Sequence, residues 1–284
     1  CPPVPRVRIR PINARAMQHL LLHAVAVKPF AGISLIMRAN LVGAVCGALM
    51  SLVLPLPAQA GPPLTIDDPG ILDPGAFEII VASAFESRDS GEQWFLPILD
   101  VSYGLGPDLQ LGVVATRVIA DPHDGSRKSD FGPAAVGLKW RFLDAGDLQM
   151  SVAPFVETLL REGAVDRGVI NDVDVWALPV QWQYQLDEWR LNAELRYVAV
   201  SGETNEWGYG VAVARPVNER IELMAELHGG ADRSLDDHGV LYRFGADVAL
   251  SERWHLLMAL GGSIDEPGDD DIELQGYFGL QWFP

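Results

Sequence analysis

The feature that most constrains this chain is an alternation of apolar and polar residues that recurs from about residue 76 to the C-terminus. It is clearest in residues 271–284, DIELQGYFGLQWFP, where every even position from Ile272 to Trp282 is apolar or glycine. Side chains of a β-strand point alternately to opposite faces, so this stretch predicts a strand with one apolar and one mostly polar face. Repeated segments of this kind, about ten residues long and separated by turn residues, are typical of transmembrane β-barrels.

Twelve segments share the alternation, and we expect each to form a strand. They are residues 76–86, 93–105, 108–119, 131–142, 147–159, 172–186, 189–200, 206–216, 220–229, 239–250, 253–262 and 271–284. The connections between them alternate between long and short, as in bacterial barrels with tight periplasmic turns and longer outer loops. An open sheet edge would leave backbone groups unpaired in lipid. We therefore predict an all-β fold, a closed antiparallel transmembrane β-barrel of about twelve strands with both termini periplasmic; a misjudged hairpin would make the number ten or fourteen.

Composition divides the chain into two unlike parts. Residues 1–60 contain no Asp or Glu and six of the 21 Lys and Arg residues, so residues 61–284 carry all 38 acids and 15 bases, a formal charge of −23. So acidic a surface argues against nucleic acid as a partner. Both cysteines, Cys1 and Cys46, lie in the first part, so the second part has neither a disulfide nor a thiol zinc site.

Residues 1–60 indicate that the protein is exported and say little about its fold. Residues 37–60 have a basic start at Met37-Arg38, an apolar run at 41–56 and small residues at Ala58 and Ala60, the −3 and −1 positions of a cleavage site after Ala60; these are the features of a secretory signal peptide. A transmembrane helix is the alternative, but sixteen apolar residues that include a proline are short for one. We interpret residues 1–36 as an over-extended N-terminal segment, with a transit peptide as the alternative. Residues 61–75, rich in Pro and Gly, are expected to be a periplasmic segment that leads into the barrel, 76–284.

The polar face of the strands predicts which side chains line the lumen. Twelve strands lie between small barrels filled by side chains and wide porins, so the lumen should be narrow. The lumen-facing candidates are Lys139, Arg141, Glu157, Glu194, Arg196, Glu222, Glu226, Arg243, Asp247 and Glu273. For Lys139 and Arg141 two interpretations stay open: a constriction that attracts anions, or ion pairs to facing carboxylates such as Glu157, Glu194 or Glu226.

Other polar groups have residue types that bind metals or perform catalysis. Glu222, Glu226 and His228 have the residue types of a proton relay or a metal site, and the acidic residues of 265–271 those of a Ca²⁺ site. The spacing in 265–271 does not match an EF-hand loop, and such groups are more often solvated or ion-paired. The sequence has no Gly-x-Ser-x-Gly and no His-x-Ser motif, although acids paired with His at loop tips stay open. We predict no catalytic, cofactor or metal site and no enzyme activity.

Several short motifs resemble a known family. They are Asp67-Asp68-Pro69, Pro74-Gly75, Glu78, Tyr103-Gly104-Leu105, Asp108-Leu109, Leu111-Gly112, Gly132, Gly137-Leu138-Lys139 and Arg141. The similarity is densest over residues 67–142, and the family is a group of outer-membrane transporters named for the meta-pathway of phenol degradation. The resemblance implies an outer-membrane barrel that passes small, aromatic molecules, without identifying the substrate.

These observations predict a protein of the Gram-negative outer membrane that acts as a passive channel or transporter for small solutes, aromatic or hydrophobic ones included. The expected partners are membrane lipid, the solute and the barrel-assembly machinery, which would act on the C-terminal strand; no cofactor is expected. The alternative is a non-conducting structural or surface-interaction barrel with acidic outer loops. A continuous water path would favour the channel, whereas a lumen closed by ion pairs or plugged by residues 61–75 would favour the alternative.

Overall fold

The computed structural model describes residues 62–284 except 124, 161, 171–172, 234–237 and 266–270, so the predicted signal peptide and the segment before it lie outside the described residues. The elements are β1 (Phe77–Arg88), β2 (Gly91–Gly106), β3 (Leu109–Pro122), β4 (Lys128–Ala145), β5 (Leu148–Val152), β6 (Phe155–Leu159), α2 (Glu162–Asp166), β7 (Val175–Leu186), β8 (Trp189–Val200), β9 (Glu206–Asn218), β10 (Ile221–Asp232), β11 (His238–Ala249), β12 (Trp254–Asp265) and β13 (Ile272–Trp282). Within these ranges, no helix is long and apolar enough to cross a membrane.

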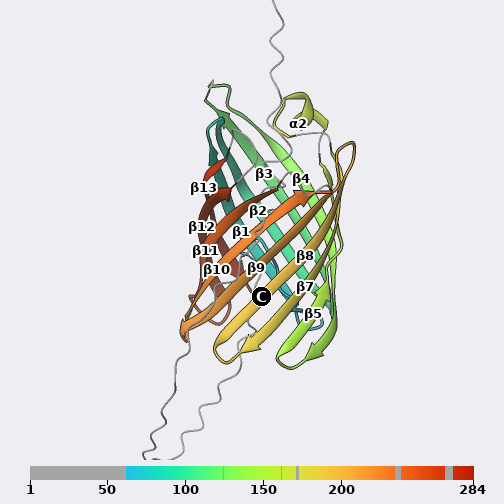
Figure 1. Cartoon of the computed structure of the whole chain (residues 1–284), viewed down its shortest axis with the longest axis vertical. Coiled ribbons are helices and arrows are strands. Elements are labelled where there is room, and N and C mark those ends of the chain that lie inside the picture. The colour runs from blue at the N-terminus through green and yellow to red at the C-terminus, as the bar shows by residue number, and fades with distance from the viewer. Residues whose placement is uncertain (1–61, 124, 161, 171–172, 234–237, 266–270) are drawn as a thin grey trace, which may run out of the picture.

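The strands close into one antiparallel barrel (Figure 1). Consecutive strands pair with one another except β5 and β6, and β1 pairs with β13 from Ile79↔Trp282 to Arg88↔Ile272, so the sheet has no free edge. β5 and β6 are two halves of one wall strand, because both pair with β4 and with β7. The break between them falls at Ala153-Pro154, where proline cannot donate a ladder hydrogen bond. The wall thus has twelve strands across, which confirms the predicted all-β, closed antiparallel barrel.

Two connections differ from the sequence-based expectation. β4 begins at Lys128 rather than at residue 131, and β1 and β2 are joined by only residues 89–90 where a longer loop was predicted. The pairs Ser87↔Glu92 and Arg88↔Gly91 continue the ladder to this turn, so residues that look like loop in the sequence belong to the strands. We call the end that carries the turns at 107–108, 146–147 and 187–188 the short-turn end. The opposite, long-loop end carries α2 (Figure 1).

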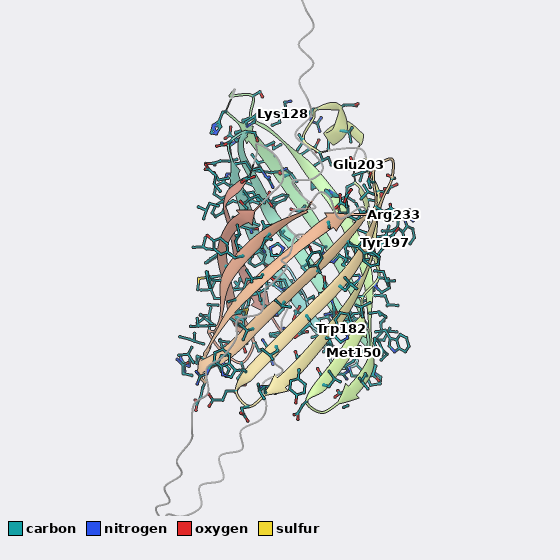
Figure 2. The ribbon with its side chains drawn as sticks, in the orientation of Figure 1. Lys128, Met150, Trp182, Tyr197, Glu203 and Arg233 are labelled. Atoms are coloured by element: carbon teal, nitrogen blue, oxygen red, sulfur yellow. The ribbon has the colours of Figure 1, made fainter. Side chains whose placement is uncertain are left out.

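The outer wall of the barrel is apolar. Phe244 is 66% exposed and Trp176 is 63% exposed, and large apolar side chains lie exposed on strands all around the sheet. At the short-turn end Trp254 and Trp282 stack at 5.6 Å between ring centroids, as in an interfacial aromatic girdle. Figure 2 shows Trp182 and Met150 on the wall, with the charged Lys128, Glu203 and Arg233 near the long-loop end. Such a wall needs lipid as its solvent, and the protein has the fold and surface of a bacterial outer-membrane barrel.

Candidate functional site in the lumen

The most informative part of the lumen is the chain that precedes β1. Residues 62–75, which we call the inner segment, lie inside the barrel (Figure 1), whereas a segment on the periplasmic side was expected. It ends next to β2, where a Cβ at Gly104 would lie 2.2 Å from the carbonyl oxygen of Asp73. Earlier in the segment, a Cβ at Gly210 would lie 2.5 Å from Cγ2 of Ile66. Glycine at both positions therefore gives the segment room against the wall.

Burial of apolar side chains helps to hold the inner segment inside the barrel. Leu64 and Ile66 form a buried cluster with Ala212, Ala214 and Met224, which face inward from β9 and β10. Burying side chains of this size contributes about 1.5–3 kcal/mol each. In the periplasm the same two side chains would stay in water, so the small inward residues of β9 favour a docked segment.

Glu226 on β10 holds the backbone of the inner segment. The Thr65 amide donates to Oε1 at 2.9 Å and to Oε2 at 3.0 Å, and the Ile66 amide donates to Oε2 at 3.1 Å. Arg243 Nε lies 4.0 Å from Oε1, and Arg243 also donates to the Pro63 carbonyl oxygen at 3.5 Å. A carboxylate that accepts several amide hydrogens forms strong, charge-assisted hydrogen bonds, so Glu226 fixes the segment rather than lining an open pore.

Lys139 and Arg141 are both paired, but with acids other than those predicted. Lys139 Nζ lies 2.5 Å from Asp67 Oδ2 and donates to the Asp68 carbonyl oxygen at 2.9 Å. Arg141 pairs with Asp108 at 3.1 Å and with Asp144 at 3.3 Å, both at the short-turn end. The predicted partners Glu157, Glu194 and Glu226 are not used, because the inner segment and the adjacent turns bring acids nearer.

The remaining candidates show where the wall is polar. Glu194 pairs with Arg196 and accepts from Gln181 Nε2 at 3.1 Å and from the Asp67 amide at 3.4 Å. Toward the short-turn end, Glu222 pairs with Arg190 at 2.6 Å, and Asp247 lies 2.8 Å from His255 Nδ1. We call the inward face marked by Lys139, Gln181, Glu194, Arg196, Glu226 and Arg243 the polar sector. The inner segment runs along it from Lys139 to Arg243.

Two candidates lie apart from this sector. Glu157 on β6 is paired across the sheet with Ala135 on β4 and Val175 on β7. Its carboxylate has no hydrogen bond or ion pair with any residue that the structure describes. Glu273 is exposed near the long-loop end of β13. The inward Arg190, Gln181, Gln275 and Asp100 were not predicted. Each lies an even number of positions from other inward residues of its own strand. The alternation of side chains along the strand could therefore have predicted them.

A second connection fills the lumen from the long-loop end. Val169 packs with Ala84, Phe95 and Val118, inward residues of β1, β2 and β3 across the barrel from β7, and Ile170 contacts this cluster. The connection is fixed by an ion pair of Arg167 with Asp130 on β4 and by a hydrogen bond from the Val169 amide to the Ala164 carbonyl oxygen at 3.0 Å. Val169 therefore caps the inward face of β1–β3.

Below this cap, part of the inward face of β1, β2, β12 and β13 is apolar. Ile80, Ala82 and Leu257 form a buried cluster, with Ile98 and Tyr277 packed against it. We call these five residues the apolar sector. Among them Ile98 and Tyr277 are half-buried rather than buried, so some space remains beside them. The lumen is thus divided into a polar sector covered by the inner segment and an apolar sector next to it.

One group in the lumen has the residue types of a catalytic triad. Thr65 Oγ1 lies 3.4 Å from His228 Nε2, and Glu226 Oε1 lies 3.8 Å from the same nitrogen. In a working triad the base contacts the nucleophile and the acid through its two different nitrogens. His228 is also fully buried, and Glu226 is occupied by two backbone amides, so the group does not have catalytic geometry. Within the described ranges, no three His, Cys, Asp or Glu side chains are arranged to hold a metal ion.

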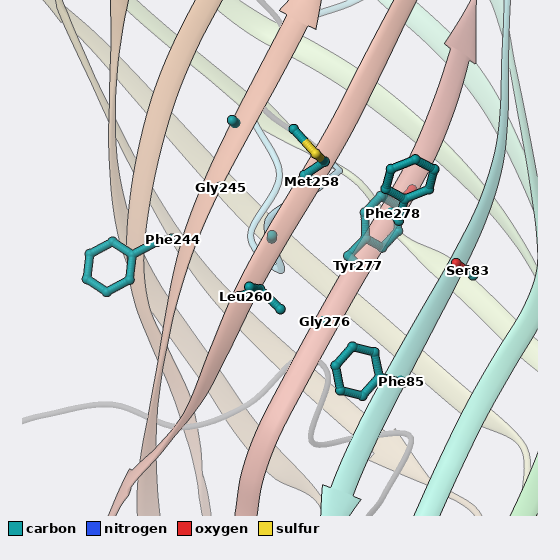
Figure 3. Close-up of a pocket in the computed structure, with 11 residues that line it drawn as sticks. Ser83, Phe85, Phe244, Gly245, Met258, Leu260, Gly276, Tyr277 and Phe278 are labelled. Atoms are coloured by element: carbon teal, nitrogen blue, oxygen red, sulfur yellow. The ribbon is translucent and has the colours of Figure 1, made fainter.

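The outer wall carries a depression lined by β1, β11, β12 and β13 (Figure 3). Phe85, Phe244, Leu260 and Phe278 border it, and its volume is about 490 Å³. The ladders β11–β12, β12–β13 and β13–β1 are paired across this region, so the depression is closed toward the lumen. Facing lipid, it is a place for hydrocarbon chains rather than an exit from the barrel.

Comparison with known proteins supports the fold. No family model matches the sequence, and no curated protein matches it, so the resemblance to the meta-pathway family is not tested. The structure is similar to the COG4313 outer membrane channel from Pseudomonas putida F1, with a TM-score of 0.62 and 13% identity over 76% of this chain and 98% of that one. It is also similar to the NanC porin (TM-score 0.53, 9% identity, 72% and 99% covered) and to a KdgM porin in complex with disordered oligogalacturonate (TM-score 0.52, 8% identity, 72% and 98% covered). These neighbours are outer-membrane barrels.

Proposed function

We propose that this protein is a narrow channel of the outer membrane for small solutes, and that apolar and aromatic molecules are the class its lumen suits. The observation that carries the proposal is the division of the lumen. The polar sector binds the inner segment, so the inward wall left for a solute includes the apolar sector of Ile80, Ala82, Ile98, Leu257 and Tyr277. The similar folds of outer-membrane channels and porins, and the resemblance to the meta-pathway family, agree with this proposal.

The second candidate is a non-conducting structural or surface-interaction barrel. It is favoured by the inner segment and by Val169, which fill the lumen from its two ends. The two candidates predict different currents. A channel gives discrete openings in a planar bilayer, and a structural barrel gives none at any voltage.

The test is single-channel recording of purified protein from residue 61 onward, with its ion selectivity. We expect small discrete openings that benzyl alcohol reduces more than xylose does, because the first solute matches the apolar sector. The Lys139→Glu variant should become more selective for cations, since it replaces an inward ammonium beside Asp67 and Asp68 with a carboxylate. Folded protein without any current would overturn the channel proposal and favour the structural barrel.

A further inference from the structure

Asp100 is an acidic group at the edge of the apolar sector. It occupies an inward position of β2, paired with Ile80 on β1 and with Val114 on β3. Ile98, one inward position away on the same strand, packs against Ile80, Ala82 and Leu257. Asp100 and Val114 are half-buried, as Ile98 is, so this carboxylate borders the remaining lumen space.

Asp100 has no neutralising partner in the described chain. No hydrogen bond or ion pair joins its carboxylate to another residue that the structure describes, and the charged groups that act on it are Glu78, Asp67 and Lys139. Lys139 is already held by Asp67 at 2.5 Å and by the Asp68 carbonyl oxygen at 2.9 Å. The ammonium that acts on Asp100 is therefore already held by Asp67, which leaves the formal negative charge of Asp100 uncompensated beside an apolar wall.

The other nearby cations are also committed. Arg141 pairs with Asp108 and Asp144 at the short-turn end. Arg243, which is near enough to act on Tyr277, donates to Gln275 Oε1 at 2.5 Å and to Pro63. An unpaired charge in a confined, partly apolar space carries a desolvation cost that a bound counter-ion offsets. A group that binds beside Asp100 should therefore carry a positive charge.

We infer that the lumen holds a binding site for a small aromatic or aliphatic ammonium ion, with the cationic group at Asp100 and the hydrocarbon part against Ile80, Ile98, Leu257 and Tyr277. The carboxylate of Asp100 accepts the N–H donors of the ligand, and the Tyr277 ring offers a face for the cation. An anion of the same size is excluded by Asp100 and Glu78. This inference rests on the proposed function, because it names the charge class of the solutes that the apolar sector takes.

The test is equilibrium binding in detergent micelles, measured by saturation-transfer NMR on three probes of nearly equal size: benzylammonium, benzyl alcohol and benzoate. We expect benzylammonium to bind about tenfold more tightly than benzoate. A hydrogen bond to a charged group such as the Asp100 carboxylate strengthens binding by about this factor. Asp100→Asn should remove this preference and weaken benzylammonium by a similar factor, while Asp100→Glu should retain it.

Glu157→Gln is the matched control. Glu157 is also an inward carboxylate without a described partner, but it lies on β6 beside Ala135 and Val175, away from the apolar sector. Its loss should leave benzylammonium binding unchanged. Equal binding of benzoate and benzylammonium overturns the inference, and so does an equal effect of the Asp100 and Glu157 variants. Since binding is measured without transport, a protein that binds benzylammonium but carries no current overturns the channel and leaves this site standing.

Discussion

The two sectors of the lumen are stabilised in different ways. In the polar sector, Glu226, Glu194 and Lys139 have partners because the inner segment supplies backbone amides, a carbonyl oxygen and a carboxylate. In the apolar sector, Ile80, Ala82 and Leu257 need only contact with other hydrocarbon. Removing the inner segment from the polar sector would leave buried charges without partners. Separating the side chains of the apolar sector would lose only their packing contacts. If the barrel conducts as we propose, a solute should therefore pass more easily on the apolar side.

The largest effect is expected from Glu226→Ala. This change removes the acceptor of the Thr65 and Ile66 amides and the carboxylate beside Arg243. Breaking a buried charged group of this kind costs about 3–5 kcal/mol. The cost should appear as faster hydrogen exchange of the Thr65 and Ile66 amides and as a lower urea midpoint. Amide protection equal to that of the unchanged protein would show that Glu226 does not hold the segment.

A smaller effect is expected from Val169→Ala in the cap above the apolar sector. Val169 is buried against Ala84, Phe95 and Val118, and removing two buried methyl groups costs about 1–2 kcal/mol. The cap should detach more often, so proteolysis near α2 should become faster while the Thr65 amide keeps its protection. Val217→Ala, at an exposed position, is the control and should change neither quantity. Faster exchange at Thr65 in the Val169 variant would mean that the two sectors are not independent.

The smallest effect is expected at the rim, from Glu188→Ala. Glu188 pairs with Arg215 at 2.8 Å, but both side chains are largely exposed, and exposed pairs contribute less than about 1 kcal/mol. The urea midpoint should therefore stay close to that of the unchanged protein. A loss as large as that of Glu226→Ala would remove the distinction between lumen and surface ion pairs on which the comparison depends.

The barrel could be predicted because its pattern is local. Alternation along each strand assigns inward and outward faces, and the number of strands across the wall follows from the number of alternating segments. The same parity places Glu194, Arg196 and Glu226 on the inward face, as the ladder does. Even so, a loop was predicted where residues 89–90 make a tight turn, because polar residues at a strand end resemble a loop.

The lumen contents could not be predicted in this way. Residues 62–75 have no period, and their docking depends on contacts with residues more than a hundred positions away, as between Thr65 and Glu226. The partner of Lys139 was missed for the same reason, since Asp67 approaches it only after the segment has entered the barrel. Val169 likewise reaches β1–β3 through a connection whose sequence carries no strand pattern. Which acids meet which bases inside a barrel is a property of the closed structure.

The central claim is that the inner segment narrows the lumen by docking on the polar sector. The most direct measurement compares the single-channel conductance of the protein from residue 61 onward with that of a variant lacking residues 62–72. A third protein, in which Gly and Ser replace these residues at equal length, separates docking from mere chain length. We predict that both changed proteins conduct several-fold more than the unchanged one. Equal conductance of all three folded proteins would contradict the claim.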